Sequence, residues 1–189
     1  MHPPEAAPTL PPWQVTQWFN TTGLLQLAGL RGRVVLIHAF QMLCPGCVAH
    51  GLPLAARVHE ACGGDALSVV GLHCVFEHHE VMGPEALRAF IHEYRLRFPI
   101  GVDAPAAAGA VPQTMALWQL RGTPSTLLLD RAGRLRLHHF GHLDELQLGL
   151  AIGQLLTEPQ AALPAAAAID TAEATAAGCA DGACVPSRS

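Results

Sequence analysis

The stretch VVLIHAFQMLCPGC, residues 34–47, joins an apolar run to two cysteines that are separated by two residues. The run VVLIHAF is continuous and begins with β-branched residues, which predicts a strand buried on both faces of a sheet. The residues after Cys47 have the apolar spacing of a helix, although Gly51 and Pro53 are expected to interrupt or kink it. Two cysteines at this spacing bind a metal, close a disulfide or carry out redox chemistry.

The predicted strand-to-helix junction affects the two cysteines differently. The first helical turn directs free N–H groups and the positive end of the helix dipole at Cys44, which favours its thiolate. Pro45 suits this turn because the N–H that proline lacks would be unpaired there. Cys47 lies one turn further in, where it is expected to be more buried and able to reach back to Cys44. Attack by one sulfur and resolution by the other is the chemistry of thiol–disulfide exchange.

The rest of the chain alternates predicted strands and helices. Strands are expected within 15–23, 34–40, 66–76 and 98–103 and in a hairpin over 125–141, and helices within 48–62, 83–98, 111–120 and 143–156. The hairpin has the strongest turn signal, Asp-Arg-Ala-Gly between two apolar runs. The order β, β, α, β, α, β, α, β, β, α predicts an α/β fold with a mixed central sheet and helices on both faces.

The ends of the chain differ in composition from the middle. Residues 1–14 carry five prolines and are expected to form an extended leader. Residues 15–156 form the predicted domain, which begins with an extra N-terminal strand. Residues 157–189 are alanine-rich and poor in large apolar side chains, which predicts a flexible tail.

The predicted tail contains a second cysteine pair, Cys179 and Cys184, separated by Ala-Asp-Gly-Ala. This turn-like spacer allows the pair to close into a disulfide. A redox shuttle that exchanges electrons with Cys44 and Cys47, a metal-binding tail and an inert remnant all remain open. The four-residue spacer does not fit the second half of a zinc ribbon.

Composition excludes several classes of function. The formal net charge is −4, 14% of the residues are charged and 5% are aromatic, which disfavours nucleic-acid binding. No apolar run approaches the roughly 20 residues of a membrane span. The N-terminus lacks the basic and apolar regions of a secretory signal, so a cytoplasmic location is expected. In that reducing compartment, a Cys-x-x-Cys pair is more often catalytic or metal-binding than structural.

Two motifs together resemble the thioredoxin superfamily. They are Cys44-Pro45-Gly46-Cys47 after a buried strand and GTPSTLLLDRAGRLRLHHFG at 122–141. The resemblance runs from about Trp18 to Leu156 and is nearest to the redoxin, TlpA-like branch of thiol–disulfide oxidoreductases. It implies a thioredoxin-like fold and an enzyme whose electrons reside in the cysteine pair, with no organic cofactor and no metal. The implied partners are a protein or small-molecule disulfide or dithiol and an upstream thiol reductant.

The resemblance also implies roles for residues near the cysteines. Pro124 matches a cis-proline that faces the dithiol, and the backbone of Thr123 would pair with an extended substrate segment. Leu43 and Pro45 flank the nucleophile on the substrate side. Leu43 stands where the family commonly has tryptophan, and the Pro-Gly order places proline directly after the nucleophile.

His38 occupies the position where thioredoxins have a buried acid beneath the resolving cysteine. A buried neutral imidazole can exchange a proton with Cys47 near physiological pH. The alternative is that His38 is a hydrogen-bonded core residue without a chemical role. The sequence leaves both roles open.

Two other functions compete with disulfide exchange. A peroxiredoxin-like thiol peroxidase needs a Pro-x-x-x-Thr-x-x-Cys loop, and Ile37 and Gln41 stand at its Pro and Thr positions. Because related Cys-x-x-Cys proteins pass electrons to peroxides, an antioxidant activity stays possible. The third hypothesis is a redox-inactive binding module with a thioredoxin fold.

A histidine-rich loop follows the strand predicted over 66–76. Its residues are Glu77, His78, His79 and Glu80, and they are expected on the active-site side of the sheet. Such residues are able to hold zinc or iron, but a plain polar loop is favoured because the helical spacing of a His site is absent. Cys62 and Cys74 are expected to be buried core thiols.

Overall fold

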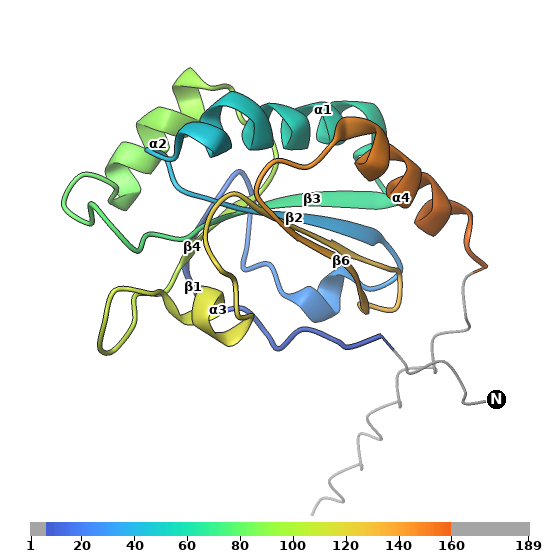
Figure 1. Cartoon of the computed structure of the whole chain (residues 1–189), viewed down its shortest axis with the longest axis horizontal. Helices are drawn as coiled ribbons and strands as arrows, with labels where there is room; N and C mark the ends of the chain where they lie inside the picture. The colour runs from blue at the N-terminus through green and yellow to red at the C-terminus, as the bar shows by residue number, and fades with distance from the viewer. Residues whose placement is uncertain (1–6, 160–189) are drawn as a thin grey trace, which may run out of the picture.

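Strand β2 (Val34–Phe40) lies at the centre of a mixed sheet, and all of its residues are buried. The computed structural model describes residues 7–159 (Figure 1). β2 runs parallel to β3 (Leu67–His73) and antiparallel to β5 (Ser125–Leu129). The sheet order is β1-β4-β3-β2-β5-β6, with β1 at Val15–Phe19, β4 at Ile100–Asp103 and β6 at Leu135–Phe140. The prediction of a strand covered on both faces is confirmed.

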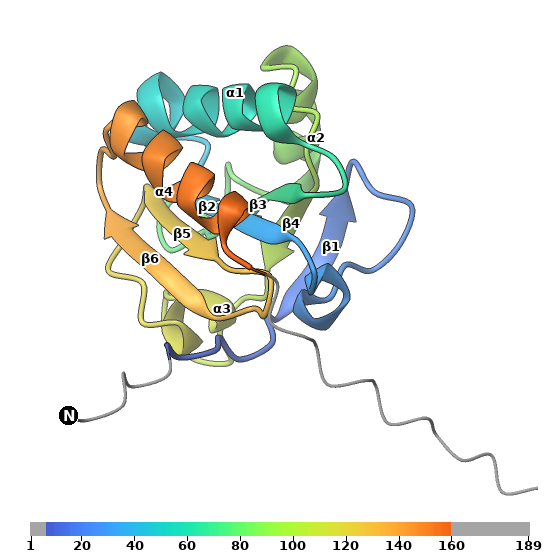
Figure 2. The same ribbon diagram turned by 90° about the vertical axis from the view of Figure 1, so that its right-hand side faces the viewer.

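Helices cover both faces of the sheet, as Figures 1 and 2 show. One face carries α1 (Leu52–Cys62), α2 (Pro84–Glu93) and α4 (Glu145–Thr157). The short helices η1 (Leu27–Leu30) and α3 (Gln113–Leu117) lie on the opposite face. Alternate side chains of β2 enter the two cores, because successive residues of a strand point to opposite faces. The element order matches the predicted one.

Several predicted ranges are longer than the observed elements, and two of them end differently for a visible reason. The helix expected over 83–98 ends at Glu93, because the chain turns at Arg95, whose φ is +52°. The strand expected over 66–76 ends at His73, where its neighbour β2 also ends. Beyond that point the backbone N–H of Phe76 donates to the side chain of Gln41 instead of to a strand.

The described part of the predicted leader packs against the domain. Thr9 forms an isolated β-bridge with Arg134. Trp13 is buried and its indole N–H donates to the Leu25 carbonyl at 2.8 Å. Trp118 packs against Trp13, with ring centroids 6.2 Å apart. Apart from the bridge at Thr9, residues 7–14 form neither a helix nor a strand, and Trp13 makes this segment part of the core.

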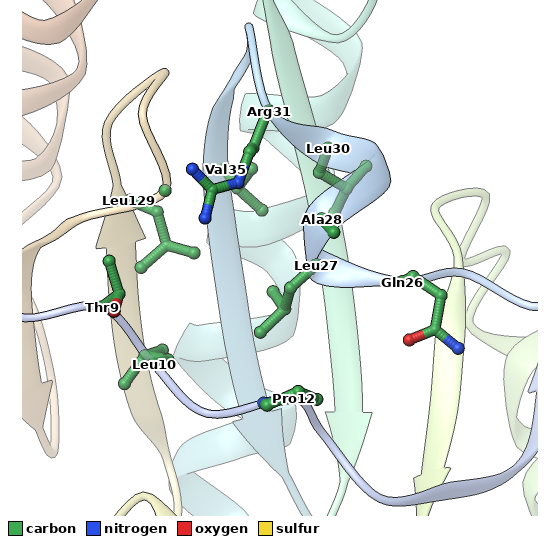
Figure 3. Close-up of a pocket in the computed structure, with 11 residues that line it drawn as sticks. Thr9, Leu10, Pro12, Gln26, Leu27, Ala28, Leu30, Arg31, Val35 and Leu129 are labelled. Carbon is green, nitrogen blue, oxygen red and sulfur yellow. The ribbon is translucent and has the colours of Figure 1, made fainter. Parts of the chain in front are cut away.

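The same segment forms one wall of a pocket of about 230 Å³. Figure 3 shows Thr9, Leu10 and Pro12 across from Leu27 and Leu30 of η1. This pocket lies beside the start of β2, at the opposite end of the strand from the cysteines. Among residues 7–159, no helix is long and apolar enough to cross a membrane.

A buried histidine ends β3. His73 is 0% exposed, and its ring lies 5.2 Å from that of Phe40. Neither ring nitrogen has a hydrogen-bond partner among the described residues. Burial lowers the pKa of His73 to about 4, so the imidazole is neutral at pH 7.

We expect His73 to make the fold sensitive to acid. Its folded-state pKa lies below the unfolded value of about 6.5, so the unfolded chain binds more protons between pH 6.5 and 4. The contribution of His73 to stability is therefore complete above pH 6.5 and is lost as the pH falls toward 4. Between pH 7.5 and 5.0 the loss is about 2 kcal/mol in the free energy of unfolding.

Urea denaturation at the two pH values measures this loss. His73→Phe should lose about 2 kcal/mol less than the wild type. His92→Gln is the control, because the His92 side chain is 86% exposed, and it should keep the wild-type pH dependence. Equal losses in the wild type and His73→Phe would contradict the assignment.

Candidate active site

Cys44 and Cys47 lie where the chain passes from β2 into a helix that begins at Pro45. Cys44 is half-buried and Cys47 is fully buried. The Cys47 thiol donates to Cys44 Sγ at 2.7 Å, and the Cys47 backbone N–H donates to the same sulfur at 3.3 Å. The outer sulfur is therefore the one a partner reaches, with the inner sulfur directly behind it.

Cys47 is held in its protonated form. Burial, together with the hydrogen bond and the charge interaction with Cys44, raises the pKa of Cys47 to about 12. The backbone of Gln41 acts against this increase. At neutral pH the inner cysteine is a thiol, which is the state expected of a resolving group that waits for the outer cysteine to react.

The helix after the cysteines begins with a wide turn. Residues Cys47–Gly51 form a π-helical turn, η2, in which the Leu52 N–H donates to the Cys47 carbonyl. Pro53 has no N–H for the carbonyl four residues earlier, so the expected interruption by Gly51 and Pro53 takes the form of this turn. A Cβ at Gly51 would lie 2.3 Å from Cε1 and Nε2 of His38. Glycine at this position therefore leaves room for the imidazole.

The loop before β5 faces the dithiol. The Thr123–Pro124 peptide bond is cis, and the Cys44 thiol donates to the Thr123 carbonyl at 3.5 Å. A Cβ built on Gly46 would lie 3.4 Å from Pro124 Cδ, so the Pro-Gly dipeptide packs against this loop. These residues, which are more than 70 positions apart in sequence, come together at the cysteine pair.

His38 is buried beneath the π-helical turn. Its ring is 2% exposed, and Nδ1 lies 3.3 Å from the Thr126 hydroxyl. Nε2 has no hydrogen-bond partner among residues 7–159. Burial lowers the pKa of His38 to about 4, which keeps the ring neutral at pH 7. His38 is thus a packed core residue, and one of its two ring nitrogens makes no hydrogen bond within the described part of the chain.

The comparisons with known proteins found matches among solved structures only. No protein-family model and no curated protein matches the chain. A solved thioredoxin-like superfamily protein is 58% identical with a TM-score of 0.78, and the match covers 80% of this chain and 97% of the other. The chain belongs to the thioredoxin-like superfamily.

Two further solved structures agree with this assignment. A thiol-disulfide isomerase from Corynebacterium glutamicum is 48% identical with a TM-score of 0.77, and the match covers 81% of this chain and 98% of the other. A thioredoxin-like protein in its oxidised form is 21% identical with a TM-score of 0.66 over 80% and 95% of the two chains. The last likeness shows the shared fold alone.

In this thioredoxin-like protein, the residues predicted on the substrate side are exposed or half-buried. The Leu43 side chain is 57% exposed, and Pro45 is exposed beside it. Thr123 and Pro124 are half-buried. Leu43 and Pro45 are the chain neighbours of Cys44, and the Thr123 carbonyl lies 3.5 Å from its sulfur.

Sequence reasoning missed the structural role of Gln41. This side chain is 1% exposed, its Oε1 accepts from the Phe76 N–H at 3.2 Å, and its Nε2 donates to the Glu77 carboxylate at 3.3 Å. Its backbone carbonyl accepts from the Cys44 N–H at 3.3 Å. Gln41 therefore ties the turn before the cysteines to the loop after β3. The only signal for this role was a polar residue that directly follows a buried strand.

The histidine-rich loop lies beside Gln41 but forms no metal cluster. Glu77, His78, His79 and Glu80 are all exposed. Within residues 7–159 no three His, Cys, Asp or Glu side chains lie close enough to hold a metal. The contact between Glu77 and Gln41 agrees with the expected position of the loop on the active-site side.

The remaining cysteines differ from one another. Cys74 is buried, as predicted. The prediction that Cys62 is a core thiol is wrong, because Cys62 is the last residue of α1 and is exposed. At that position the helix has passed the end of the sheet-facing core, and glycines follow. Cys179 and Cys184 lie outside the described residues.

We expect Gly51→Ala to destabilise the protein although its backbone is helical, with φ −66° and ψ −49°. The added methyl group would overlap the His38 ring, and overpacking of this kind costs about 1–3 kcal/mol. Gly153→Ala in α4 is the matched control, because no atom lies within 4 Å of the added Cβ. This control should gain about 0.5–1 kcal/mol.

Urea denaturation of both variants measures the difference. In a His38→Ala background the ring is gone, so the cost of Gly51→Ala should shrink markedly. The prediction is contradicted if Gly51→Ala has the same free energy of unfolding as the wild type. It is also contradicted if the cost of Gly51→Ala is the same with and without the His38 ring.

Proposed function

We propose that the protein is a thiol–disulfide oxidoreductase that uses Cys44 as nucleophile and Cys47 as resolving residue. The observation that carries this proposal is the half-buried Cys44 sulfur, 2.7 Å from a buried thiol that donates to it. Membership in the thioredoxin-like superfamily and the 48% identity to a thiol-disulfide isomerase support the same chemistry. The two sulfurs carry the electrons, without an organic cofactor.

The reaction balances in two exchanges. The Cys44 thiolate attacks a partner disulfide, one partner sulfur bonds to Cys44, and the other leaves as a thiolate. Cys47 then loses its proton and attacks Cys44 Sγ, which releases the second partner thiolate. The partner gains two electrons, and the enzyme is left with a Cys44–Cys47 disulfide. An upstream thiol reductant restores the dithiol.

The interactions of Cys47 suit this order of events. Its pKa is raised by burial and also by the hydrogen bond and charge interaction with Cys44. Once Cys44 is bonded to a partner sulfur, it carries no negative charge, so that part of the increase disappears. Formation of the mixed disulfide therefore prepares Cys47 for its own attack.

We propose that the partner is a protein or small molecule with an accessible disulfide, held on the exposed side of Cys44. The Thr123 carbonyl lies 3.5 Å from Cys44 Sγ. A partner backbone that pairs with Thr123 would therefore lie within reach of this sulfur. Leu43 and Pro45 offer apolar contact beside it. Bound in this way, an extended segment brings its disulfide to Cys44.

A peroxidase is less well supported. Gln41 stands where a peroxidase loop would have threonine, and its amide group is engaged by Phe76 and Glu77. A buried amide held at both ends is not free to polarise a peroxide. Peroxide consumption, measured with and without Cys44, tests this alternative directly.

We expect Cys44→Ser to lower the rate of insulin disulfide reduction by on the order of 100-fold or more, because the nucleophile is lost. Cys47→Ser should retain the first exchange and accumulate a mixed disulfide, visible on a non-reducing gel. Cys62→Ser is the control, because this cysteine is exposed at the far end of α1, and it should keep the wild-type rate. A Cys44→Ser variant as active as the wild type would favour a redox-inactive binding module.

We further propose that Cys179 and Cys184 act as a redox shuttle between Cys44 and large partners. The chain leaves the domain just after α4, where Arg136 binds the Glu158 carboxylate through two contacts of 2.7 Å. Pro159 and Cys179 are separated by twenty residues, and a random-coil chain of that length would span roughly 25 Å. Cys44 would exchange with the tail disulfide, and the resulting tail dithiol would reduce the external disulfide.

The double variant Cys179→Ser/Cys184→Ser tests the shuttle. Its turnover should fall severalfold with a protein disulfide and stay unchanged with a small-molecule disulfide that reaches Cys44 directly. Truncation after Pro159, which keeps the contacts of Glu158, should reproduce the effect. Equal rates with the protein substrate would make the tail pair an inert remnant.

A further inference from the structure

A cavity of about 510 Å³ lies at the β1 edge of the sheet, where α2 ends. Figures 1 and 2 both show β1 and α2 on the same side of the molecule. The end of β1 contributes Trp18 and Phe19 to the walls, and α2 contributes Ile91. Small-molecule sites have volumes of about 300–1,000 Å³. Because β1 is three strands away from β2, roughly 14 Å, this cavity is separate from the dithiol that follows β2.

The cavity concentrates positive charge in a chain that is negative as a whole. Its walls include Arg88, Arg95 and Arg97, three of the eleven basic Lys and Arg residues of a chain with a formal net charge of −4. Among the described residues, none of those that line the cavity is acidic. A guanidinium group is a planar donor that binds two oxygens of a phosphate or carboxylate at once. The cavity therefore suits an anionic ligand.

The three arginines are available to a ligand. Within residues 7–159, Arg95 and Arg97 form no ion pair. Arg88 lies 3.6 Å from the Glu85 carboxylate, but both side chains are more than half exposed, and a surface pair of this kind contributes little. The Arg88 guanidinium also lies over the Phe19 ring, 5.3 Å from its centroid, which holds it against the wall of the cavity.

The backbone at Arg95 suits glycine better than arginine. Its φ is +52°, and it follows α2 in a helix-ending motif in which the Leu96 N–H donates to the Ile91 carbonyl and the Arg95 N–H donates to the His92 carbonyl. Glycine is the usual residue at this position because it adopts a positive φ without strain. Strained backbone of this kind concentrates at functional sites. The presence of arginine here indicates a use for its side chain.

The turn that carries Arg95 and Arg97 is fixed before any ligand binds. Asn20 Nδ2 donates to the Leu96 carbonyl at 2.8 Å and to the Phe98 carbonyl at 3.0 Å. The side chains of Leu96 and Phe98 alternate with the two arginines and are buried. A turn held in this way presents both arginines with a small ordering cost on binding.

We propose that this cavity binds a small molecule through a diphosphate group. A phosphate group carries a charge of about −1.5 to −2 at pH 7, so two adjacent phosphates balance three guanidinium groups. Free diphosphate and a nucleoside diphosphate share this chemistry. The half-buried Trp18 offers an apolar surface to the base of a nucleotide. Binding at this site does not depend on the proposed disulfide exchange.

Isothermal titration calorimetry with inorganic pyrophosphate, at about 0.15 M ionic strength, tests the site. We expect a dissociation constant in the micromolar range for the wild type. Tighter binding of adenosine diphosphate would identify a nucleotide as the ligand, and equal or weaker binding would identify free diphosphate. Absence of binding of both at about 1 mM would overturn the proposal. The tricarboxylate citrate should bind more weakly, and equal affinity for citrate would overturn the assignment to phosphate.

Single substitutions locate the binding site. Arg95→Gly should weaken pyrophosphate binding by about tenfold or more, because a charged donor is lost. Its melting temperature should be unchanged or higher, because glycine accommodates the φ of +52°. Arg97→Gln should weaken binding to a similar extent. Arg57→Gln is the matched control, because it removes an exposed arginine of α1 that pairs with Glu145, and it should keep the wild-type affinity.

Two outcomes would overturn the location of the site. One is an unchanged affinity of Arg95→Gly and Arg97→Gln for pyrophosphate. The other is an equal loss of affinity in Arg57→Gln, which would show that only the net charge of the protein matters. A lower melting temperature of Arg95→Gly would contradict the argument that arginine is retained at this position for its side chain.

Discussion

The complete burial of β2 is the constraint on which the rest of the structure depends. Its side chains enter two cores in alternation, Val35, Ile37 and Ala39 on one side of the sheet and Val34, Leu36 and Phe40 on the other. Each large apolar side chain buried in this way stabilises the fold by about 1.5–3 kcal/mol. Because neighbouring strands are bonded to both edges of β2, its end is fixed in space, and Cys44 follows four residues later. A rigid strand thus positions a reactive residue that lies in a turn.

The same alternation points His38 toward the face covered by α1, α2 and α4, where an apolar residue would be expected. Three local features accommodate the His38 side chain. The Thr126 hydroxyl meets one ring nitrogen, Gly51 leaves space above the ring, and the chain widens into a π-helical turn where Pro53 removes a hydrogen bond. π-helical turns of this kind are frequent at functional sites, where the function offsets their cost in stability.

Features encoded by short windows of sequence were predictable. The continuous apolar run defined β2, the Cys-x-x-Cys pair marked its end, and Asp-Arg-Ala-Gly marked the β5–β6 turn, in which Gly133 has φ +77°. The position of Pro124 opposite the dithiol came from the family resemblance rather than from any local pattern.

Features that depend on distant contacts were not predictable in this way. Trp13 and Trp118 pack together across more than a hundred positions, and this contact draws the proline-rich segment into the core. The exposed position of Cys62 depends on where α1 leaves the sheet, which helical spacing alone does not reveal. The pairing of His50 with His142 likewise arises only when η2 and the end of β6 meet in space.

Burial shifts the pKa values of Cys47 and His38 in opposite directions. Burial and the interactions with Cys44 raise the pKa of Cys47 to about 12, and burial lowers the pKa of His38 to about 4, so both groups are neutral at pH 7. Part of the increase in the Cys47 pKa comes from Cys44. Reaction of Cys44 with a partner disulfide would remove that part, so Cys47 would lose its proton more readily once the mixed disulfide has formed. In the proposed exchange, this coupling keeps Cys47 a thiol until a mixed disulfide has formed.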